Sequence, residues 1–251
     1  MQSYIFLDLD DTLFQTLRKC EYPASDPRLI ARAYLKDGSP NSYATNKQQW
    51  LWDYVDKGFK IVPVTGRDSL EFNRVTLPFA EDVVLNHGAV ILNKHRAIDT
   101  GWMVKMKEQL PEYDEKLLVV WKEIDAYCKQ SVGYKMRLVT DFDITWYGVI
   151  KHVDATEKVL QLLLHAVIIN HPYIVDGSLY WHLNGNNLAV LPKIIKKEHA
   201  VSYLMARYKQ QYPELITLGA GDSYTDAAFM SLCDYALVPK NTQLFKRLTV
   251  N

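Results

Sequence analysis

The chain alternates short apolar runs with segments in which apolar residues recur every three or four positions. Runs of strand length that end in small or polar residues lie at 4–7, 59–64, 83–85, 215–218 and 235–238. Helical spacing is found at about 46–58, 69–75 and 198–208, and again from about 225. Strands that alternate with helices predict a parallel sheet with helices packed on its faces.

The middle of the chain has a different pattern. An amphipathic helix is predicted at 111–130, and strands at 135–140, 144–151, 173–175, 179–183 and 188–191. Asp154 and Glu157 have the spacing of a capping box, which predicts a helix from there to about 169, before Pro172. Alternating strands joined by tight turns favour an antiparallel α+β module. We therefore expect an α/β protein with a discontinuous core domain, 1–87 and 189–251, and an inserted α/β cap domain, 88–188.

Composition narrows the number of domains and the classes of partner that we expect. The 251 residues carry no formal net charge and are 48% hydrophobic, which fits one large domain or two modest ones. The neutral balance argues against nucleic acid as a partner. Asp8 comes too early for a signal peptide, and no apolar window reaches membrane-spanning length. Three widely spaced cysteines favour reduced thiols and a cytoplasmic protein. We expect a monomer or a small homo-oligomer.

Polar side chains with chemical potential follow the predicted core strands. They are Asp8 and Asp10 after the first strand, Thr65 after the second, Asp222 and Asp226 after the fourth, and Lys193 before the helix that leads to the fourth strand. Parallel strands bring their carboxyl ends to one edge of the sheet, so these groups can converge. Lys196 and Lys197 compete with Lys193, which we prefer because it directly follows an apolar strand.

This set of residues suits phosphoryl transfer. Clustered carboxylates without histidine or cysteine favour a hard cation, Mg²⁺, bound through oxygen. A phosphate group near that site needs cations and hydrogen-bond donors, which Thr65 and the lysine can supply. One carboxylate can attack phosphorus, and a second, two residues further on, can act as acid and then as base.

The same residues resemble the motifs of the haloacid dehalogenase (HAD) superfamily of phosphatases. The four matching stretches, in chain order, are Asp8-Leu9-Asp10-Asp11-Thr12, Val64-Thr65-Gly66-Arg67, Leu191-Pro192-Lys193 and Gly221-Asp222-Ser223-Tyr224-Thr225-Asp226. The inserted module resembles the type-IIB cap of the Cof-type and sucrose-phosphate phosphatases. Asn86-His87-Gly88-Ala89 resembles the Asn-Gly element that those proteins carry where the cap begins.

The resemblance implies a role for each matching residue. Asp8 would be the nucleophile and a metal ligand, and Asp10 the general acid/base with its backbone carbonyl on the metal. The phosphoryl group would be held by Thr65, Gly66 and Lys193, and Mg²⁺ further by Asp222 and Asp226. Two residues near the chemistry, Arg67 and Asn86, and three in the cap, Arg137, Tyr180 and His182, are candidates for substrate specificity.

The predicted function is hydrolysis of a small phosphorylated metabolite, a sugar or sugar-acid phosphate, through an aspartyl-phosphate on Asp8. Two alternatives stay open at this stage. A phosphomannomutase-like enzyme has a similar cap, and a non-catalytic scaffold could bind phosphorylated metabolites. Retention of both Asp8 and Asp10 argues against the scaffold, because binding alone does not need both.

Overall fold

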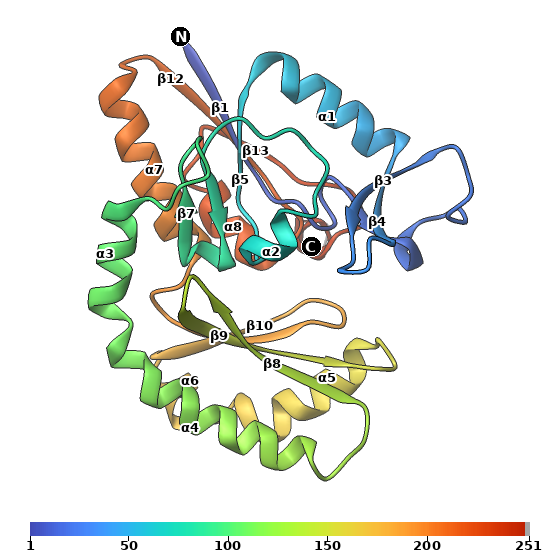
Figure 1. Ribbon diagram of the computed structural model, residues 1–251, viewed down its shortest axis with the longest axis vertical. Coiled ribbons are helices and arrows are strands. Elements are labelled where there is room, and N and C mark those ends of the chain that lie inside the picture. Colours follow the sequence, from blue (N-terminus) through green and yellow to red (C-terminus); the bar gives the residue numbers. More distant parts are fainter. Residues whose placement is uncertain (249–251) are drawn as a thin grey trace. The chain divides into compact units, whose positions relative to one another are not determined.

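The computed structural model describes residues 1–248 and divides the chain into two compact units. The first is formed by Met1–Trp102 together with the chain from Lys196 onward, and the second by Met103–Ile195. The chain thus leaves the first unit once and returns once, as expected for an inserted domain (Figure 1). Among residues 1–248, no helix is both long enough and apolar enough to cross a membrane.

The first unit is organised on a parallel sheet with strand order β13-β12-β1-β5. Its strands are β1 (Gln2–Leu7), β5 (Lys60–Pro63), β12 (Leu215–Ala220) and β13 (Tyr235–Leu237). The central strand β1 is flanked on both sides, and its residues Ile5, Phe6 and Leu7 are fully buried. Continuous apolar sequence here reflects burial on both faces of the sheet.

Helices and turns of the first unit connect and cover these strands. They are α1 (Asn46–Gly58), α2 (Ser69–Phe72), α7 (Lys197–Gln211), α8 (Tyr224–Met230) and α9 (Gln243–Leu248). Thr45 caps α1 through a complete capping box with Gln48, so this helix begins where the sequence predicts. After β5, Val64 forms a parallel bridge with Val84, which extends the sheet to the hairpin of β6 (Val83–Leu85) and β7 (Val90–Leu92).

A small antiparallel sheet fills the long excursion between β1 and α1. It consists of β2 (Gln15–Thr16), β4 (Pro40–Thr45) and β3 (Leu29–Tyr34) in that order, with the short 3-10 helix η1 (Leu17–Lys19) after β2. A turn at Asp37-Gly38 joins β3 to β4, and Gly38 there has a φ of +82°. Left-handed backbone of this kind favours glycine.

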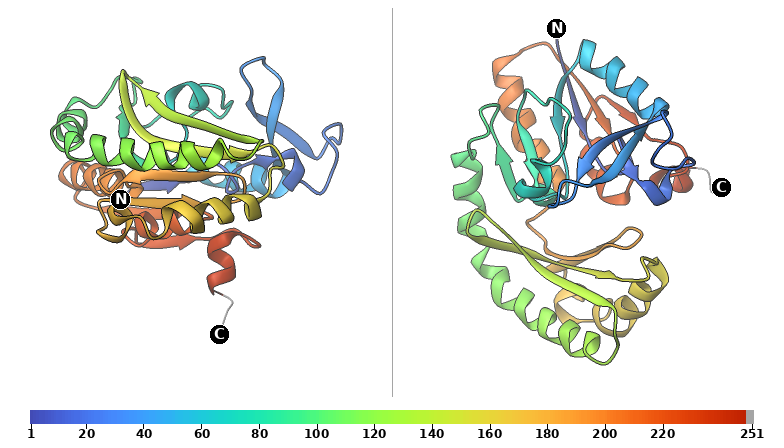
Figure 2. Two further views of the ribbon diagram at one scale, coloured as in Figure 1. Left: turned by 90° about the horizontal axis from the view of Figure 1, so that it is seen from below. Right: turned by 45° about the vertical axis from the view of Figure 1, so that its right-hand side comes forward.

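The second unit packs helices against an antiparallel sheet of order β10-β11-β9-β8 (Figure 2). Its strands are β8 (Tyr134–Asp141), β9 (Ile144–His152), β10 (Leu179–Leu183) and β11 (Leu188–Pro192). Its helical segments are α4 (Pro111–Cys128), α5 (Glu157–Leu163), η3 (Leu164–Ile168) and α6 (Pro172–Val175), and α3 (Thr100–Gln109) begins in the first unit. A Cβ at Gly148 of β9 would lie 2.3 Å from the Trp121 ring, so α4 covers this face closely.

Two local expectations are wrong, and one helix is missed. Residues 173–175 are helical rather than extended, because Pro172 at the first position of α6 starts a helical turn. Asp154 does not cap α5, which starts at Glu157 behind Thr156, because the backbone turns left-handed at Ala155. Helix α3 is absent from the predicted elements, since Gly101 and scattered charges weaken its apolar pattern.

The unit borders also differ from those expected. The β6–β7 hairpin continues the core sheet, which moves the first border from residue 87 to Trp102. Strand β11 pairs with β9 and β10, which moves the return from residue 189 to Lys196. Residues that the sequence predicts to open the returning core, Lys193 among them, thus belong to the second unit.

Candidate active site

The site lies where β1, β5 and β12 end side by side. The backbone N–H of Asp8 donates to Ala220 at 2.9 Å, and that of Val64 donates to Leu7 at 2.9 Å. These bonds carry the parallel pairing one residue beyond the strands. The first residues of the three following loops are thereby held next to one another, as expected for a parallel sheet.

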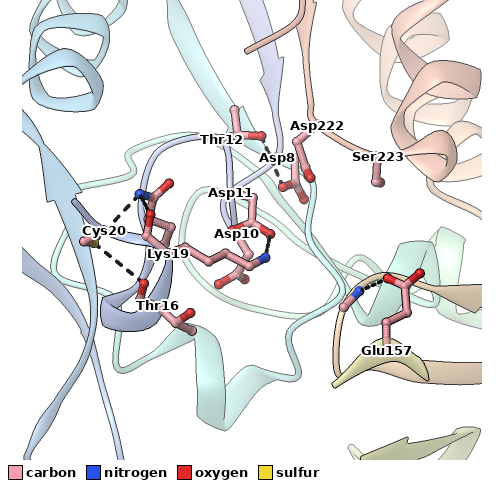
Figure 3. A network of polar contacts seen from close by, with 12 residues as sticks. Asp8, Asp10, Asp11, Thr12, Thr16, Lys19, Cys20, Glu157, Asp222 and Ser223 are labelled. Carbon is pink, nitrogen blue, oxygen red and sulfur yellow. Dashed lines mark hydrogen bonds and ion pairs between the residues drawn. The ribbon is translucent and has the colours of Figure 1, made fainter. Parts of the chain in front are cut away.

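Three carboxylates come together at this edge. Asp8, Asp222 and Asp226 each offer an oxygen, and the three oxygens lie within 4.8 Å of one another. All three side chains are buried, and Figure 3 shows Asp8 and Asp222 facing the same space. A buried set of oxygen donors without nitrogen or sulfur fits Mg²⁺, which binds through a few carboxylates and keeps some of its water.

Asp226 is fixed by the turn that precedes it. Its Oδ2 accepts hydrogen bonds from the backbone N–H of Asp222 at 3.1 Å and of Ser223 at 2.9 Å, and from the Ser223 hydroxyl at 2.7 Å. A Cβ at Gly221 would lie 2.4 Å from the Asp226 Cβ, so only glycine lets the turn close. The spacing Gly-Asp-x-x-x-Asp thus brings two carboxylates together from the loop and first turn of α8.

Lys197, rather than Lys193, lies among these carboxylates. Its Nζ is 2.6 Å from Asp8 Oδ1 and 2.6 Å from Asp226 Oδ1, and the side chain is buried. Lys193 is exposed in the second unit, where its backbone N–H continues the pairing of β11 by donating to Ser178. The expectation for Lys193 is therefore corrected: the strand before it belongs to a different sheet from the one that carries Asp8.

The charges of the site shift one another's proton affinities. Burial raises the pKa of Asp8 well above its usual range, although the Lys197 ammonium opposes this. Burial, followed by the charge of Asp226, raises the pKa of Asp222 to about 7. Burial would also raise the pKa of Asp226, but Lys197 and the hydrogen bonds from Ser223 outweigh it, so the pKa falls.

Asp10 turns its carboxylate to Arg67. The guanidinium binds both oxygens in a bidentate pair, with Nε 2.7 Å from Oδ2 and Nη2 2.7 Å from Oδ1. The Asp10 side chain is 46% exposed, in contrast to the buried Asp8. Two carboxylates two residues apart therefore have different surroundings, which fits two different chemical roles.

Thr65 and Gly66 lie in the loop that follows β5, next to the turn at residues 86–88. Thr65 is buried, and its hydroxyl accepts a bond from the Arg67 backbone N–H at 3.2 Å. A Cβ at Gly66 would lie 2.5 Å from the His87 ring, so a larger residue there would displace this ring. Asn86 is fully buried with a φ of 51°, a conformation that asparagine tolerates better than most residues.

Asp11 and Thr12 complete the first loop. Asp11 has a φ of 63° and forms an ion pair with Lys19 of η1, which brings the excursion to the edge of the site (Figure 3). The Thr12 hydroxyl donates to Asp8 Oδ2 at 3.4 Å. The three acidic residues of this stretch thus have separate partners: Lys197 for Asp8, Arg67 for Asp10 and Lys19 for Asp11.

The specificity candidates in the second unit share one sheet face. His182, Ala189, Val149 and Arg137 are directly paired across β10, β11, β9 and β8 and form one row. Gly148, next to Val149 on β9, faces α4, so this row lies on the face away from that helix. The Tyr180 hydroxyl donates to the carbonyl of Ile195 at 2.6 Å, near the return to the first unit.

Sequence reasoning undervalued Lys197, although its position carries a signal. The buried residues of α7 recur at helical spacing, and Lys197 starts that series: Lys197, Ala200, Val201, Leu204, Met205 and Tyr208. A lysine in register with an apolar stripe faces the interior of the protein, and a buried lysine needs an anionic partner. That periodicity, rather than distance from the preceding strand, indicates the lysine that lies against Asp8 and Asp226.

The chain matches known proteins over most of its length. Residues 1–244 match the model of the family described as sucrose-6F-phosphate phosphohydrolase. A curated glucosyl-3-phosphoglycerate/mannosyl-3-phosphoglycerate phosphatase of Methanococcoides burtonii is 35% identical over 81 residues. Those residues are 32% of this chain, and the match spans only a quarter of that relative's length.

Solved structures support the fold. The C-terminal domain of C. albicans trehalose-6-phosphate phosphatase superposes with a TM-score of 0.60 at 15% identity, over 92% of this chain and 72% of that one. The sucrose-phosphatase of Synechocystis sp. PCC6803, solved with sucrose and phosphate, gives 0.52 at 13% identity, over 99% and 96%. Together with the acidic site at the strand ends, the family match identifies the chain as a member of the sucrose-6F-phosphate phosphohydrolase family of HAD-type phosphatases.

Proposed function

We propose that this protein is a Mg²⁺-dependent phosphomonoesterase that hydrolyses a small phosphorylated sugar or sugar acid through an aspartyl-phosphate on Asp8. The observation that carries the proposal is the convergence of Asp8, Asp222 and Asp226 within 4.8 Å, with the Lys197 amine against Asp8. The family match and the relatives' printed activities, all on phosphorylated sugars or their acids, support the same substrate class.

The site residues of the first unit then have separate roles. Asp8, Asp222 and Asp226 would hold Mg²⁺, together with the backbone carbonyl of Asp10. When bound, the cation neutralises charge on the phosphoryl oxygens and orients them. Lys197 and Thr65, together with Gly66, bind the same oxygens.

The chemistry proceeds in two steps. In the first, a carboxylate oxygen of Asp8 forms a bond to phosphorus while the ester P–O bond breaks, and Asp10 gives its proton to the leaving alkoxide. In the second, Asp10 removes a proton from water, whose oxygen attacks phosphorus and releases phosphate from Asp8. Splitting hydrolysis in this way replaces one difficult step by two easier ones.

Arg67 has to release Asp10 in the first step. A carboxylate held by both arms of a guanidinium has no proton to donate, so the bidentate pair describes the ionised form. We infer that substrate entry separates the pair, so that Asp10 takes up a proton from solvent before the first step, and that Arg67 afterwards orients the carboxylate that this step leaves ionised. Asn86, Arg137, Tyr180 and His182 remain candidates for contacts with the organic part of the substrate.

The test is a panel of phosphorylated sugars and sugar acids with Mg²⁺, measured as phosphate release. The panel includes sucrose 6-phosphate, trehalose 6-phosphate and glucosyl-3-phosphoglycerate, and Asp8→Asn is the matched variant. We expect turnover by the wild type, dependent on Mg²⁺, and a loss of turnover in Asp8→Asn. Turnover by the variant contradicts the nucleophile, whereas isomerisation without phosphate release favours a phosphosugar mutase.

A further inference from the structure

The short turn η2 (Asn86–Gly88) binds the loop that carries Thr65. The backbone N–H of Asn86 donates to the Arg67 carbonyl at 2.9 Å, and that of His87 donates to the Thr65 carbonyl at 3.0 Å. The His87 ring also packs on the bare α-carbon of Gly66. Two consecutive bonds and one ring contact therefore fix the end of β5 to this turn.

The other end of the turn binds the start of α7. Gly88 has a φ of +104°, and a Cβ there would lie 2.3 Å from the carbonyl oxygen of Lys196 and 3.1 Å from the backbone nitrogen of Lys197. The peptide that precedes the buried lysine thus rests directly on the α-carbon of Gly88. The turn and α7 are in contact, and Figure 1 shows α7 beside the β6–β7 hairpin.

Trp102 binds the turn through its indole N–H. Its indole Nε1–H donates to the carbonyls of Gly88 and of the next residue at 3.1 and 3.2 Å, and its side chain is buried. The backbone N–H of Trp102 donates to Asp99 Oδ1 at 2.9 Å. Asp99 also accepts bonds from Tyr203 and Arg207 of α7. These contacts form a closed ring that starts and ends on the helix of Lys197.

Both chain connections between the units pass through this ring. Trp102 is the last residue of the first unit before the chain leaves it, and Lys196 is the first residue after the chain returns. The turn therefore contacts Trp102 and Lys196, the two residues of the first unit at which the chain leaves and returns. A shift of the backbone at either residue would be passed on to the site through the turn. Its contacts with Thr65, Lys196 and Trp102 all lie within the first unit.

We propose that the Asn86–Gly88 turn is a positioning element that keeps the Lys197 amine and the Thr65 hydroxyl at one spacing for the phosphoryl group. The proposal rests on the proposed function for the roles of those two groups. This positioning role is separate from the substrate contact for which Asn86 is a candidate. The turn acts through the Lys196–Lys197 peptide on one side and the Thr65–Gly66 segment on the other.

Gly88→Ala tests this position, and Gly38→Ala is its matched control. Both glycines have positive φ, +104° and +82°, but Gly38 has nothing within 4 Å of an added Cβ. Both variants therefore acquire backbone strain, and only the first displaces the Lys196 carbonyl. We expect kcat to fall about 10- to 100-fold in Gly88→Ala, the usual cost of a misplacement of about 1 Å. KM should change less, and Gly38→Ala should keep the wild-type kcat.

A second readout needs no activity. Lys197 is 5% exposed between two carboxylates, so it should resist reductive methylation in the wild type, with exposed Lys36 as the internal standard. Peptide mass spectrometry should show several-fold faster methylation of Lys197 in Gly88→Ala. Trp102→Phe, which removes the two indole bonds but keeps the ring, should produce the same change to a smaller extent.

The outcomes separate the two proposals. Wild-type kcat and protected Lys197 in Gly88→Ala, or equal exposure of Lys197 in Gly38→Ala, would overturn the positioning role. If Gly88→Ala does not fold, Trp102→Phe decides by the same two measurements. If the wild type releases no phosphate from any substrate, the proposed function fails, and the methylation pattern alone decides the role of the turn.

Discussion

At the scale of single residues, the position of the lysine distinguishes two readings of the sequence. Lys197 touches Asp8 and Asp226, and Lys193 is an exposed residue of the other unit. We expect Lys197→Ala to lower kcat by about 10²- to 10³-fold, as for the loss of one preorganised donor. Lys193→Ala should leave kcat within about twofold, since it removes a solvated charge. Steady-state phosphate release measures both, and similar losses would contradict this assignment.

The pairing of Asp10 with Arg67 gives a second prediction at this scale. Arg67→Lys keeps the charge but replaces the two-armed contact by a single ammonium, which should leave Asp10 less well oriented. We expect kcat to fall about tenfold or more, with a smaller change in KM, because the proposed mechanism uses Asp10 in both chemical steps.

Arg28→Lys is the matched control for Arg67→Lys. Arg28 binds Asp26 with the same bidentate geometry, 2.8 and 2.7 Å, on the exposed excursion. Its replacement should leave kcat unchanged. An unchanged kcat in Arg67→Lys would show that a single cation suffices to hold Asp10.

At the scale of elements, the sequence predicts the parallel strands well. It predicts less well to which sheet a later strand belongs. Continuous apolar runs and a capping box are local signals, and β1, β12 and α1 carry them. The assignment of β11 to a sheet is not a local property, because it depends on pairing with strands far away in the chain. The preference for Lys193 over Lys197 follows directly from that one misplaced strand.

The site residues also divide into those with a local sequence signal and those that depend on the tertiary fold. Asp8, Asp10, Asp222 and Asp226 are predictable because each stands at a fixed offset from a strand end. The partner of Asp10 is a tertiary fact, since Arg67 lies 57 residues further along the chain. The role of Gly88 as a rest for the Lys196 peptide is likewise visible only once α7 is in place.

The anchoring of α7 gives a pH prediction. Burial alone would raise the pKa of Asp99, but the bonds from Trp102, Tyr203 and Arg207 outweigh it and lower the pKa below its usual 3.8. A depressed carboxyl pKa stabilises the folded state above the unfolded-state pKa, and that contribution is lost as the pH falls through the folded-state pKa.

Asp99→Asn tests this sign. The difference in Tm between wild type and variant should be constant near neutral pH and should shrink from about pH 4 downward. Thermal unfolding by circular dichroism across pH 7 to about 2.5 measures it. A difference that grows on acidification would mean that Asp99 is not held in its ionised form.

At the scale of the whole molecule, the acidic site belongs to only one of the two units. Asp8, Asp222 and Asp226 all lie in the first unit, and Mg²⁺ binding should therefore stabilise that unit selectively. A ligand at 100 times its Kd contributes about 2.7 kcal/mol to the folded state. For 150–250 residues this corresponds to a rise in Tm of roughly 5–11 °C. A transition of the second unit, if it unfolds separately, should not move.

Asp222→Asn and Asp143→Asn separate specific binding from a general effect of the salt. Asp143 is an exposed turn residue of the second unit with a φ of 62°, a conformation that asparagine also accepts. Asp222→Asn should lose most of the Mg²⁺-induced shift, while Asp143→Asn should retain it. Without Mg²⁺, Asp222→Asn should be at least as stable as the wild type, because one of three crowded carboxyl groups no longer has to carry a charge. Differential scanning calorimetry with and without Mg²⁺ resolves both transitions, and a full shift in Asp222→Asn would place the cation elsewhere.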